Sequence, residues 1–297
     1  MVKKVSKLNK TNIAPWLFVL PGIMFILIFV YIPIIQNFYY SLFRMNSYSP
    51  DVTFIGFKNY IDMFSDPIFY TAIKNNSWYA IISVICQVGF GAILAIILES
   101  KFATTLNKYF RTIYFLPSVI SITAVGLMWY FVYNPNLGML NALIRKISSS
   151  DFDFAWLGNP KTAIFSIIAM SQWQYTGYIM VLIIVAIQKI PEVLYEVAKI
   201  EGANEFQKAI YITIPQIKEM LLLVCVITVI GAFKLFTEVF VMTRGGPYDS
   251  SQVLGTFMYR HAFFFDELGY AAAVATVIFI ITFSLSLLQI KLAKSGK

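Results

Sequence analysis

The chain has 297 residues, of which 59% are apolar and 13% are charged. Soluble domains carry about 25% charged residues, so this composition excludes an ordinary soluble protein. The formal net charge of +8 comes from Lys and Arg scattered over short segments between apolar blocks, which argues against a nucleic-acid-binding surface. The two cysteines lie in separate apolar runs without a CxxC pattern, so neither a disulfide framework nor a metal site is indicated.

Apolar blocks long enough to cross a bilayer recur along the chain. A membrane span needs roughly 20 apolar residues, and we expect an all-α polytopic protein with six such spans. They cover residues 15–35, 78–98, 112–133, 162–188, 220–243 and 269–290. The first block is longer than the apolar core of a signal peptide and lacks a small-residue cleavage site, so we interpret it as a retained helix.

The Lys and Arg residues between the blocks predict the orientation. Fourteen of them fall in the tail 1–14, the loops after the second and fourth blocks and the tail 291–297, against eight in the other loops. Cytoplasmic segments are enriched in Lys and Arg. Both termini and the loop 189–219 are therefore predicted to be cytoplasmic, around one transmembrane domain at 15–290.

Within that loop, residues 190–215 are charged and show the apolar periodicity of helices on both sides of Gly202. Gly202 is suited to the left-handed position that ends a helix, and Asn204 is suited to cap a second one ending at Pro215. Helices this short are unstable alone in water, so their apolar stripes must be buried. Burial against this protein's own helix ends and docking into a partner fit the pattern equally well.

The same segment resembles the EAA loop of ABC-importer permeases, whose pattern is EAAxxxG, a gap of nine residues, then IxLP. The matching residues are Glu196, Ala198, Gly202, Ile212 and Pro215. Val197, Glu201 and Ile214 depart from the pattern but keep the size or charge of the usual residues.

Motifs along almost the whole chain are similar to carbohydrate-uptake permeases of the maltose/glycerol-3-phosphate type. They include Pro21, Gly22, Pro33, Gly56, Asn59, Asp66, Pro67, Arg111, Pro117, Trp129, Gly138, Asn141, Trp173, Gly177, Gly245, Gly246 and Pro247. Arg244 departs from this likeness, since Gly is common there. The resemblance implies the type I ABC importer fold with a cytoplasmic coupling helix. It also implies a second permease subunit in a heterodimer, two ATP-binding subunits and an extracytoplasmic sugar-binding protein.

The chain has no GxxxxGK(S/T) phosphate loop, so we expect no ATPase activity of its own, with ATP and Mg bound by the partner subunits. In the resembled family the EAA loop couples the spans to those subunits, and we expect residues 203–210 to lie nearest the ATPase. The predicted coupling residues are Glu196, Ala198, Gly202, Ala203, Asn204, Glu205, Phe206, Lys208, Ala209, Ile210 and Pro215.

Polar and aromatic residues inside the spans are candidates for a substrate pathway. Lys234 and Glu238 lie four residues apart where an unpaired charge costs at least about 2.5–3.5 kcal/mol, so they should face a partner or water. The amides, hydroxyls and rings in the middle of the fourth span suit a sugar, although mutual pairing and interhelical hydrogen bonds are the alternative. The candidate pathway residues are Trp129, Gln172, Trp173, Gln174, Tyr175, Gly177, Phe233, Lys234, Phe236, Thr237 and Glu238.

We therefore expect a permease subunit of an ATP-driven, binding-protein-dependent importer in the cytoplasmic membrane of a prokaryote. It would move a sugar or oligosaccharide by alternating access, with glycerol phosphate or another polyol as the nearest alternative. A secondary transporter would predict inverted repeats and more acidic residues at mid-membrane. A membrane enzyme would need a metal or nucleophile constellation, which the sequence does not show.

Overall fold

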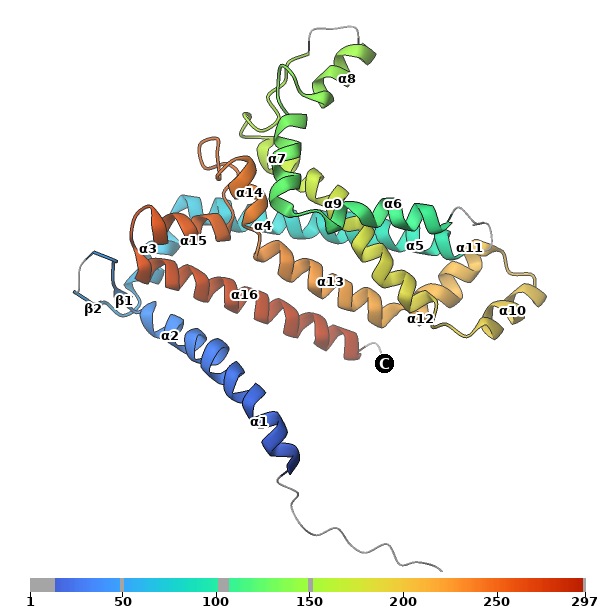
Figure 1. Cartoon of the computed structure of the whole chain (residues 1–297), viewed down its shortest axis with the longest axis horizontal. Helices are drawn as coiled ribbons and strands as arrows, with labels where there is room; N and C mark the ends of the chain where they lie inside the picture. Colours follow the sequence, from blue (N-terminus) through green and yellow to red (C-terminus); the bar gives the residue numbers. More distant parts are fainter. Residues whose placement is uncertain (1–13, 49–50, 101–106, 149–151, 296–297) are drawn as a thin grey trace, which may run out of the picture.

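The computed structural model describes residues 14–48, 51–100, 107–148 and 152–295, which form a largely helical molecule (Figure 1). Within these residues, four helices are long and apolar enough to cross a membrane alone, or up to six if each of two bent helix pairs is one span. The predicted all-α polytopic fold is confirmed. Residues 1–13 of the predicted N-terminal tail and residues 296–297 of the C-terminal tail lie outside the described part.

The first span is a helical rod that stands apart from the other helices (Figure 1). It consists of α1 (Ala14–Ile26), the π-helical turn η1 (Leu27–Tyr31) and α2 (Ile32–Tyr40). Its α2 end reaches the bundle, where Asn37 Nδ2 donates to the carbonyl of Ala272 at 3.2 Å and to Thr276 Oγ1 at 3.1 Å. The helix therefore continues past the predicted end at residue 35, because its last turns pack on α16 (Leu268–Ser295).

A short polar insertion separates this rod from the second span. Strands β1 (Phe43–Arg44) and β2 (Thr53–Phe54) pair antiparallel, and α3 (Lys58–Ser65) follows. The second span runs through α4 (Pro67–Ser83), the π-helical segment η2 (Val84–Phe90) and α5 (Gly91–Glu99). It begins well before residue 78, because Asp66 Oδ1 accepts from the Ile68 N–H at 2.7 Å and Pro67 suits the first helical turn.

The third span is broken, which differs from the uninterrupted helix expected over 112–133. Helices α6 (Asn107–Val119) and α7 (Ile122–Val132) meet at an angle of 96°. Ser121 between them has extended backbone (φ −53°, ψ 131°). The break leaves the Ile120 carbonyl outside the helical ladder, and buried Gln174 of α9 (Ala163–Ile187) donates to it at 3.1 Å. A side chain from another span therefore satisfies the backbone group that the bend exposes.

The second bent pair joins the helix Glu205–Gln216 to the helix Lys218–Phe233 at 69°. The fifth span is also interrupted further on, where a continuous helix was expected over 220–243. Helix α13 (Lys218–Phe233) ends before α14 (Thr237–Met242) begins. Fully buried Asn76 of α4 supports the end of α13: its Nδ2 donates to the Ala232 carbonyl at 2.6 Å, and its Oδ1 accepts from the N–H of Leu254, the first residue of α15 (Leu254–Phe263), at 2.9 Å. Gly255 lets the chain close here, because a Cβ at that position would overlap the Leu235 carbonyl.

The remaining helices pack on α4 and α13 or extend from the bundle ends. Helix α8 (Met139–Ser148) lies on an arm beyond α7, and α15 (Leu254–Phe263) precedes α16 (Figure 1). The loop after α9 contains α10 (Glu192–Ile200), α11 (Glu205–Lys208), the π-helical turn η3 (Ala209–Thr213) and α12 (Ile214–Gln216). Helix α16 continues to Ser295, past the predicted end of the last span at residue 290.

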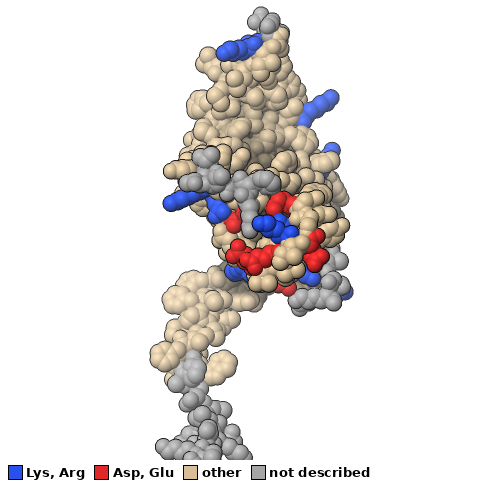
Figure 2. All heavy atoms as spheres, turned by 90° about the vertical axis from the view of Figure 1, so that its right-hand side faces the viewer, with Lys and Arg blue, Asp and Glu red and all other residues tan. Residues whose placement is uncertain are grey.

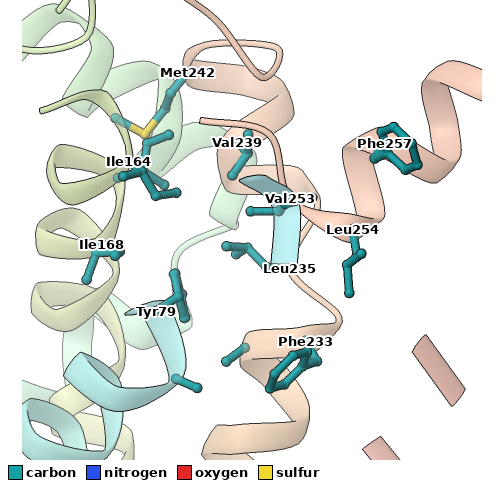
Figure 3. Packing of buried hydrophobic residues seen from close by; sticks show 14 of the residues in the cluster. Tyr79, Ile164, Ile168, Phe233, Leu235, Val239, Met242, Val253, Leu254 and Phe257 are labelled. Atoms are coloured by element: carbon teal, nitrogen blue, oxygen red, sulfur yellow. The ribbon is translucent and has the colours of Figure 1, made fainter. Parts of the chain in front are cut away.

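Two apolar clusters hold the bundle together. One joins α4, α9, α13, α14 and α15 through residues such as Tyr79, Ile168, Phe233, Val239 and Phe257 (Figure 3). The second joins η2, α5, α9 and α13 near the projecting loop. Helix α9 contributes to both clusters, so it is the central helix of the bundle. The broken third and fifth spans pack around it, and the loop after α9 extends from its end.

Candidate functional site

The loop after α9 forms a projecting segment, defined here as residues 190–215, at one end of the molecule (Figure 1). Pro191 has extended backbone (φ −58°, ψ 128°) and precedes the first helical residue of α10, so α10 begins one residue later than expected. No residue of α10 is buried. Helix α10 is therefore presented to whatever lies beyond this chain, whereas α11 buries one residue, Lys208.

Gly202 ends α10 in the manner that its sequence predicts. Its φ is +80°, the left-handed region that glycine adopts most readily. The Gly202 N–H donates to the Lys199 carbonyl at 3.2 Å and the Ala203 N–H donates to the Ala198 carbonyl at 2.8 Å. These two bonds form a Schellman motif, which satisfies carbonyls at the end of α10 and turns the chain sharply toward α11.

Asn204 caps α11, as its position in the sequence predicts. The Gln207 N–H donates to Asn204 Oδ1 at 2.9 Å, and the Asn204 N–H donates to Gln207 Oε1 at 2.8 Å. This reciprocal pair is a capping box. The hydroxyls of Tyr195 and Thr213 lie 2.9 Å apart and tie the two arms of the segment together.

The apolar stripes of the projecting segment are exposed. Val193 is 63% exposed, Ile200 84%, Phe206 73% and Tyr211 75%. Acidic and basic side chains gather on this end of the molecule (Figure 2). Of the two explanations for the stripes, packing on this protein's own helix ends does not account for these side chains. Their exposure is what a docking surface requires.

Most of the predicted coupling residues are accessible on this segment. Glu196, Gly202, Asn204, Phe206, Ile210 and Pro215 are exposed, and Ala198, Ala203, Glu205 and Ala209 are partly exposed. Lys208 is the exception: it is 8% exposed, and its Nζ pairs with Glu205 Oε1 at 2.8 Å. Lys208 therefore contributes to the internal structure of α11 rather than to its free surface.

A buried polar cluster lies between α4, α9 and α14. The hydroxyls of Tyr79 and Ser171 share a short hydrogen bond. Gln172 Nε2 donates to Ser83 Oγ at 3.2 Å and to the Ile168 carbonyl at 2.8 Å. Sequence reasoning missed Tyr79, Ser83 and also Gln87, which donates to Ser83 Oγ at 3.4 Å. Their spacing of four residues inside an apolar span was the signal that could have identified them.

Glu238 adds a carboxyl group to this cluster, whereas Lys234 does not. Glu238 is 8% exposed in the first turn of α14 and interacts electrostatically with Tyr79 and Tyr175. Lys234 is exposed and caps the end of α13. The helix break between them removes the one-turn spacing that the sequence indicated, and no ion pair joins these two described residues. Thr237, partly exposed, precedes Glu238.

Two tryptophans pack against each other between α7 and α9. Trp129 of α7 and Trp173 of α9 meet edge to face with ring centroids 5.7 Å apart. The Trp129 indole N–H and the Gln172 carbonyl oxygen are buried without a hydrogen-bond partner in the described part of the chain. A substrate or water that reached them could satisfy both groups.

Other candidate pathway residues have structural positions. Phe233 is 7% exposed in the apolar cluster of Figure 3, and Gln174 serves the bend of the third span. Gly177 permits α6 to touch α9, since a Cβ there would overlap the Tyr114 carbonyl. Phe236 stacks on Phe240, with ring centroids 5.1 Å apart. Packing thus explains Phe233, Gly177 and Phe236 without a substrate, whereas Gln174 Oε1 is buried without a partner in the described part of the chain.

Comparisons with known proteins agree with this geometry. The model of the family "binding-protein-dependent transport system inner membrane component" matches residues 87–294. A probable ABC transporter permease protein of Bacillus subtilis strain 168, YurN, is 50% identical over 289 residues, covering 97% of this chain and 99% of its own. The lactose transport system permease protein LacF of Rhizobium radiobacter is 31% identical and covers 95% of this chain and 94% of its own. The arabinooligosaccharides transport system permease protein AraP of B. subtilis is 30% identical, covering 96% and 90%.

Solved structures share the fold. A chain of a bacterial ABC transporter involved in the import of the acidic polysaccharide alginate superposes with a TM-score of 0.84 at 23% identity, over 95% of both chains. A second structure of a bacterial alginate transporter, in complex with an alginate pentasaccharide-bound periplasmic protein, gives a TM-score of 0.82 at 23% identity, over 93% of this chain and 92% of the other.

Proposed function

The chain belongs to the family of binding-protein-dependent transport system inner membrane components, and on this premise we propose that it carries a sugar or oligosaccharide. It is a multi-pass subunit of an ABC importer in the cytoplasmic membrane. The sugar class is supported by relatives over nearly the whole chain whose names specify lactose and arabinooligosaccharides. The observation that carries the proposed mechanism is the projecting segment, whose apolar side chains face away from the rest of the chain.

The projecting segment is the proposed docking site for two ATP-binding partner subunits, which would hold ATP and Mg themselves. An amphipathic helix that lies in a partner's groove buries apolar residues one turn apart, and Phe206 and Ile210 of α11 and η3 have that spacing. The capping box of Asn204 fixes the direction of α11 before a partner arrives. We therefore place the main contact at residues 203–210, with α10 supporting it.

The proposed pathway follows the buried polar cluster toward the two tryptophans. Gln172 and Glu238 supply hydrogen-bonding groups, and Trp129 and Trp173 supply ring faces for the C–H surface of a sugar. Thr237 and Tyr175 flank the same region from α14 and α9. A second, non-identical permease subunit would complete the wall of this pathway. We also propose, from the distribution of Lys and Arg, that both termini and the projecting segment are cytoplasmic. The sugar-binding protein would then dock at the opposite, extracytoplasmic end of the molecule.

Reconstitution with partners tests the proposal. The chain is co-expressed with candidate ATPase and permease subunits, purified and placed in liposomes, and uptake of labelled oligosaccharides is measured with the cognate binding protein. We expect uptake that depends on ATP, and ATP hydrolysis that the sugar-loaded binding protein stimulates. Uptake driven by an ion gradient without ATP would refute it in favour of a secondary transporter. Stimulation by glycerol phosphate alone would keep the machinery and change the substrate class.

A further inference from the structure

One carboxylate ties together the ends of three helices beside the projecting segment. Glu99 is the last residue of α5, and its Oε1 accepts a short hydrogen bond from Arg111 Nη2 of α6. The same oxygen accepts from Gln188 Nε2 at 3.2 Å. Gln188 is the residue that caps the end of α9, so α5, α6 and α9 all meet at Glu99.

Further hydrogen bonds make this junction more than an isolated ion pair. The Leu98 carbonyl accepts from Asn107 Nδ2 at 2.7 Å and from Arg111 Nη2 at 3.5 Å. The last carbonyls of a helix have no partner within the helix, and a cation near them is also favoured by the helix dipole. The Glu99 side chain is only 17% exposed, so solvent screens this network less than an ordinary surface pair.

The junction lies where the projecting segment leaves and rejoins the bundle. After Gln188, the Ile190 N–H donates back to the Ile187 carbonyl at 3.0 Å, and the chain then enters α10. It returns at Ile217, which is 2% exposed. Ile187, Ile217 and Leu98 belong to one apolar cluster. The two ends of the projecting segment and the end of α5 therefore pack in the same apolar cluster, next to Glu99.

A movement of α10 must reach the bundle mainly through these two ends, because no residue of α10 is buried. Helix α11 and η3 each bury one residue, Lys208 and Thr213, and the Thr213 hydroxyl bonds back to Tyr195 of α10. From the ends, the Gln188–Glu99–Arg111 chain leads directly to α6. Helix α6 leads in turn to the 96° bend and to α7, which carries Trp129. This is a contiguous set of contacts between the proposed docking site and the proposed pathway.

We propose that Glu99, with Arg111 and Gln188, is a positioning residue that transmits the movement of the projecting segment to the bent third span. The inference rests on the proposed function, since it requires an ATPase that moves the segment. A role confined to stability predicts a different result. Loss of a merely structural contact lowers the amount of folded protein, whereas loss of transmission lowers the sugar transported per ATP hydrolysed.

The test uses the full transporter in liposomes and measures uptake and ATP hydrolysis together. Glu99→Gln keeps the shape of the side chain but removes its charge. We expect the ratio of sugar transported to ATP hydrolysed to fall about 5- to 10-fold, at the low end of typical coupling free energies between sites. The ATPase should still co-purify with the variant, because the docking surface is unchanged.

A charge swap distinguishes the junction from a general effect of substitution. Glu99→Lys combined with Arg111→Glu restores an ion pair, and Gln188 can donate or accept, so we expect the double variant to recover most of the ratio. Ser100→Ala is the matched control: it removes the hydrogen bond that Ser100 Oγ donates to the Ile97 carbonyl at 2.7 Å, at the same helix end as Glu99, and leaves the ion pair intact. We expect it to leave the ratio unchanged.

The outcomes separate the two proposals. An unaltered chain without ATP-driven uptake refutes the proposed function, and this inference with it. A functional unaltered chain whose Glu99→Gln variant has the same ratio refutes the inference alone. If Glu99→Gln reduces folded protein, Gln188→Leu, which leaves the ion pair intact, takes its place, and an unchanged ratio in that variant also refutes the inference.

Discussion

Gly202 offers the sharpest test of the projecting segment, because its requirement for glycine is purely conformational. A Cβ at this position would meet nothing within 4 Å, so a side chain has room. Its φ of +80° is nonetheless unfavourable for other L-residues, by about 1–2 kcal/mol. A cost of one to two kcal/mol shifts an equilibrium by about 5- to 30-fold. We therefore expect Gly202→Ala to lower the equilibrium constant for forming the docking-competent turn by that factor.

The assay measures the co-purified ATPase and the ATP-driven uptake for three variants. Gly231→Ala is the matched control, since a Cβ there also meets nothing within 4 Å but the residue lies inside α13. We expect that control to be neutral, and Gly202→Asn to be milder than Gly202→Ala because Asn tolerates the left-handed region. Membrane insertion should be unchanged in all three. Full coupling in Gly202→Ala would refute the reasoning that this turn must be preformed.

Three further substitutions test the bundle and the polar cluster. Gly177→Ala should separate α6 from α9 and destabilise the protein by about 1–3 kcal/mol through overpacking, measured as thermal stability in detergent. Gly89→Ala is the control and should not destabilise the protein, because a Cβ there would have no atom within 4 Å. Asn76→Ala should cost about 2–5 kcal/mol, because it leaves the Ala232 carbonyl and the Leu254 N–H buried without a partner; a melting temperature equal to that of the unaltered chain would contradict this. Glu238→Gln should raise the KM for uptake about tenfold by weakening a charged acceptor, and an unchanged KM would remove Glu238 from the pathway.

The local chemistry of the projecting segment was predictable from the sequence. The turn at Gly202 and the cap at Asn204 depend on residues no more than five positions away, and both formed as expected. Span existence was predictable for the same kind of reason, since a continuous apolar run needs no information from elsewhere in the chain. The exposure of the apolar stripes was not predictable, because the periodicity of a sequence does not show whether the surface that covers a stripe belongs to the same chain or to a partner.

The breaks in the third and fifth spans could not be predicted from the sequence, because hydropathy does not show where a helix bends or ends. Each break also depends on a distant amide: Gln174 supports one and Asn76 the other. A buried amide in a span can therefore satisfy a carbonyl that a break has freed, and need not bind substrate. Polarity alone therefore does not distinguish a pathway residue from one that supports a break. The better criterion is a buried polar atom that the described chain leaves without a partner. Among the candidate pathway residues, Trp129, Gln172 and Gln174 meet it. The two glutamines meet it in the same way, since the Nε2 of each donates to the protein while the Oε1 of each is buried without a partner. The proposed pathway therefore rests on these three residues of α7 and α9 rather than on polarity alone.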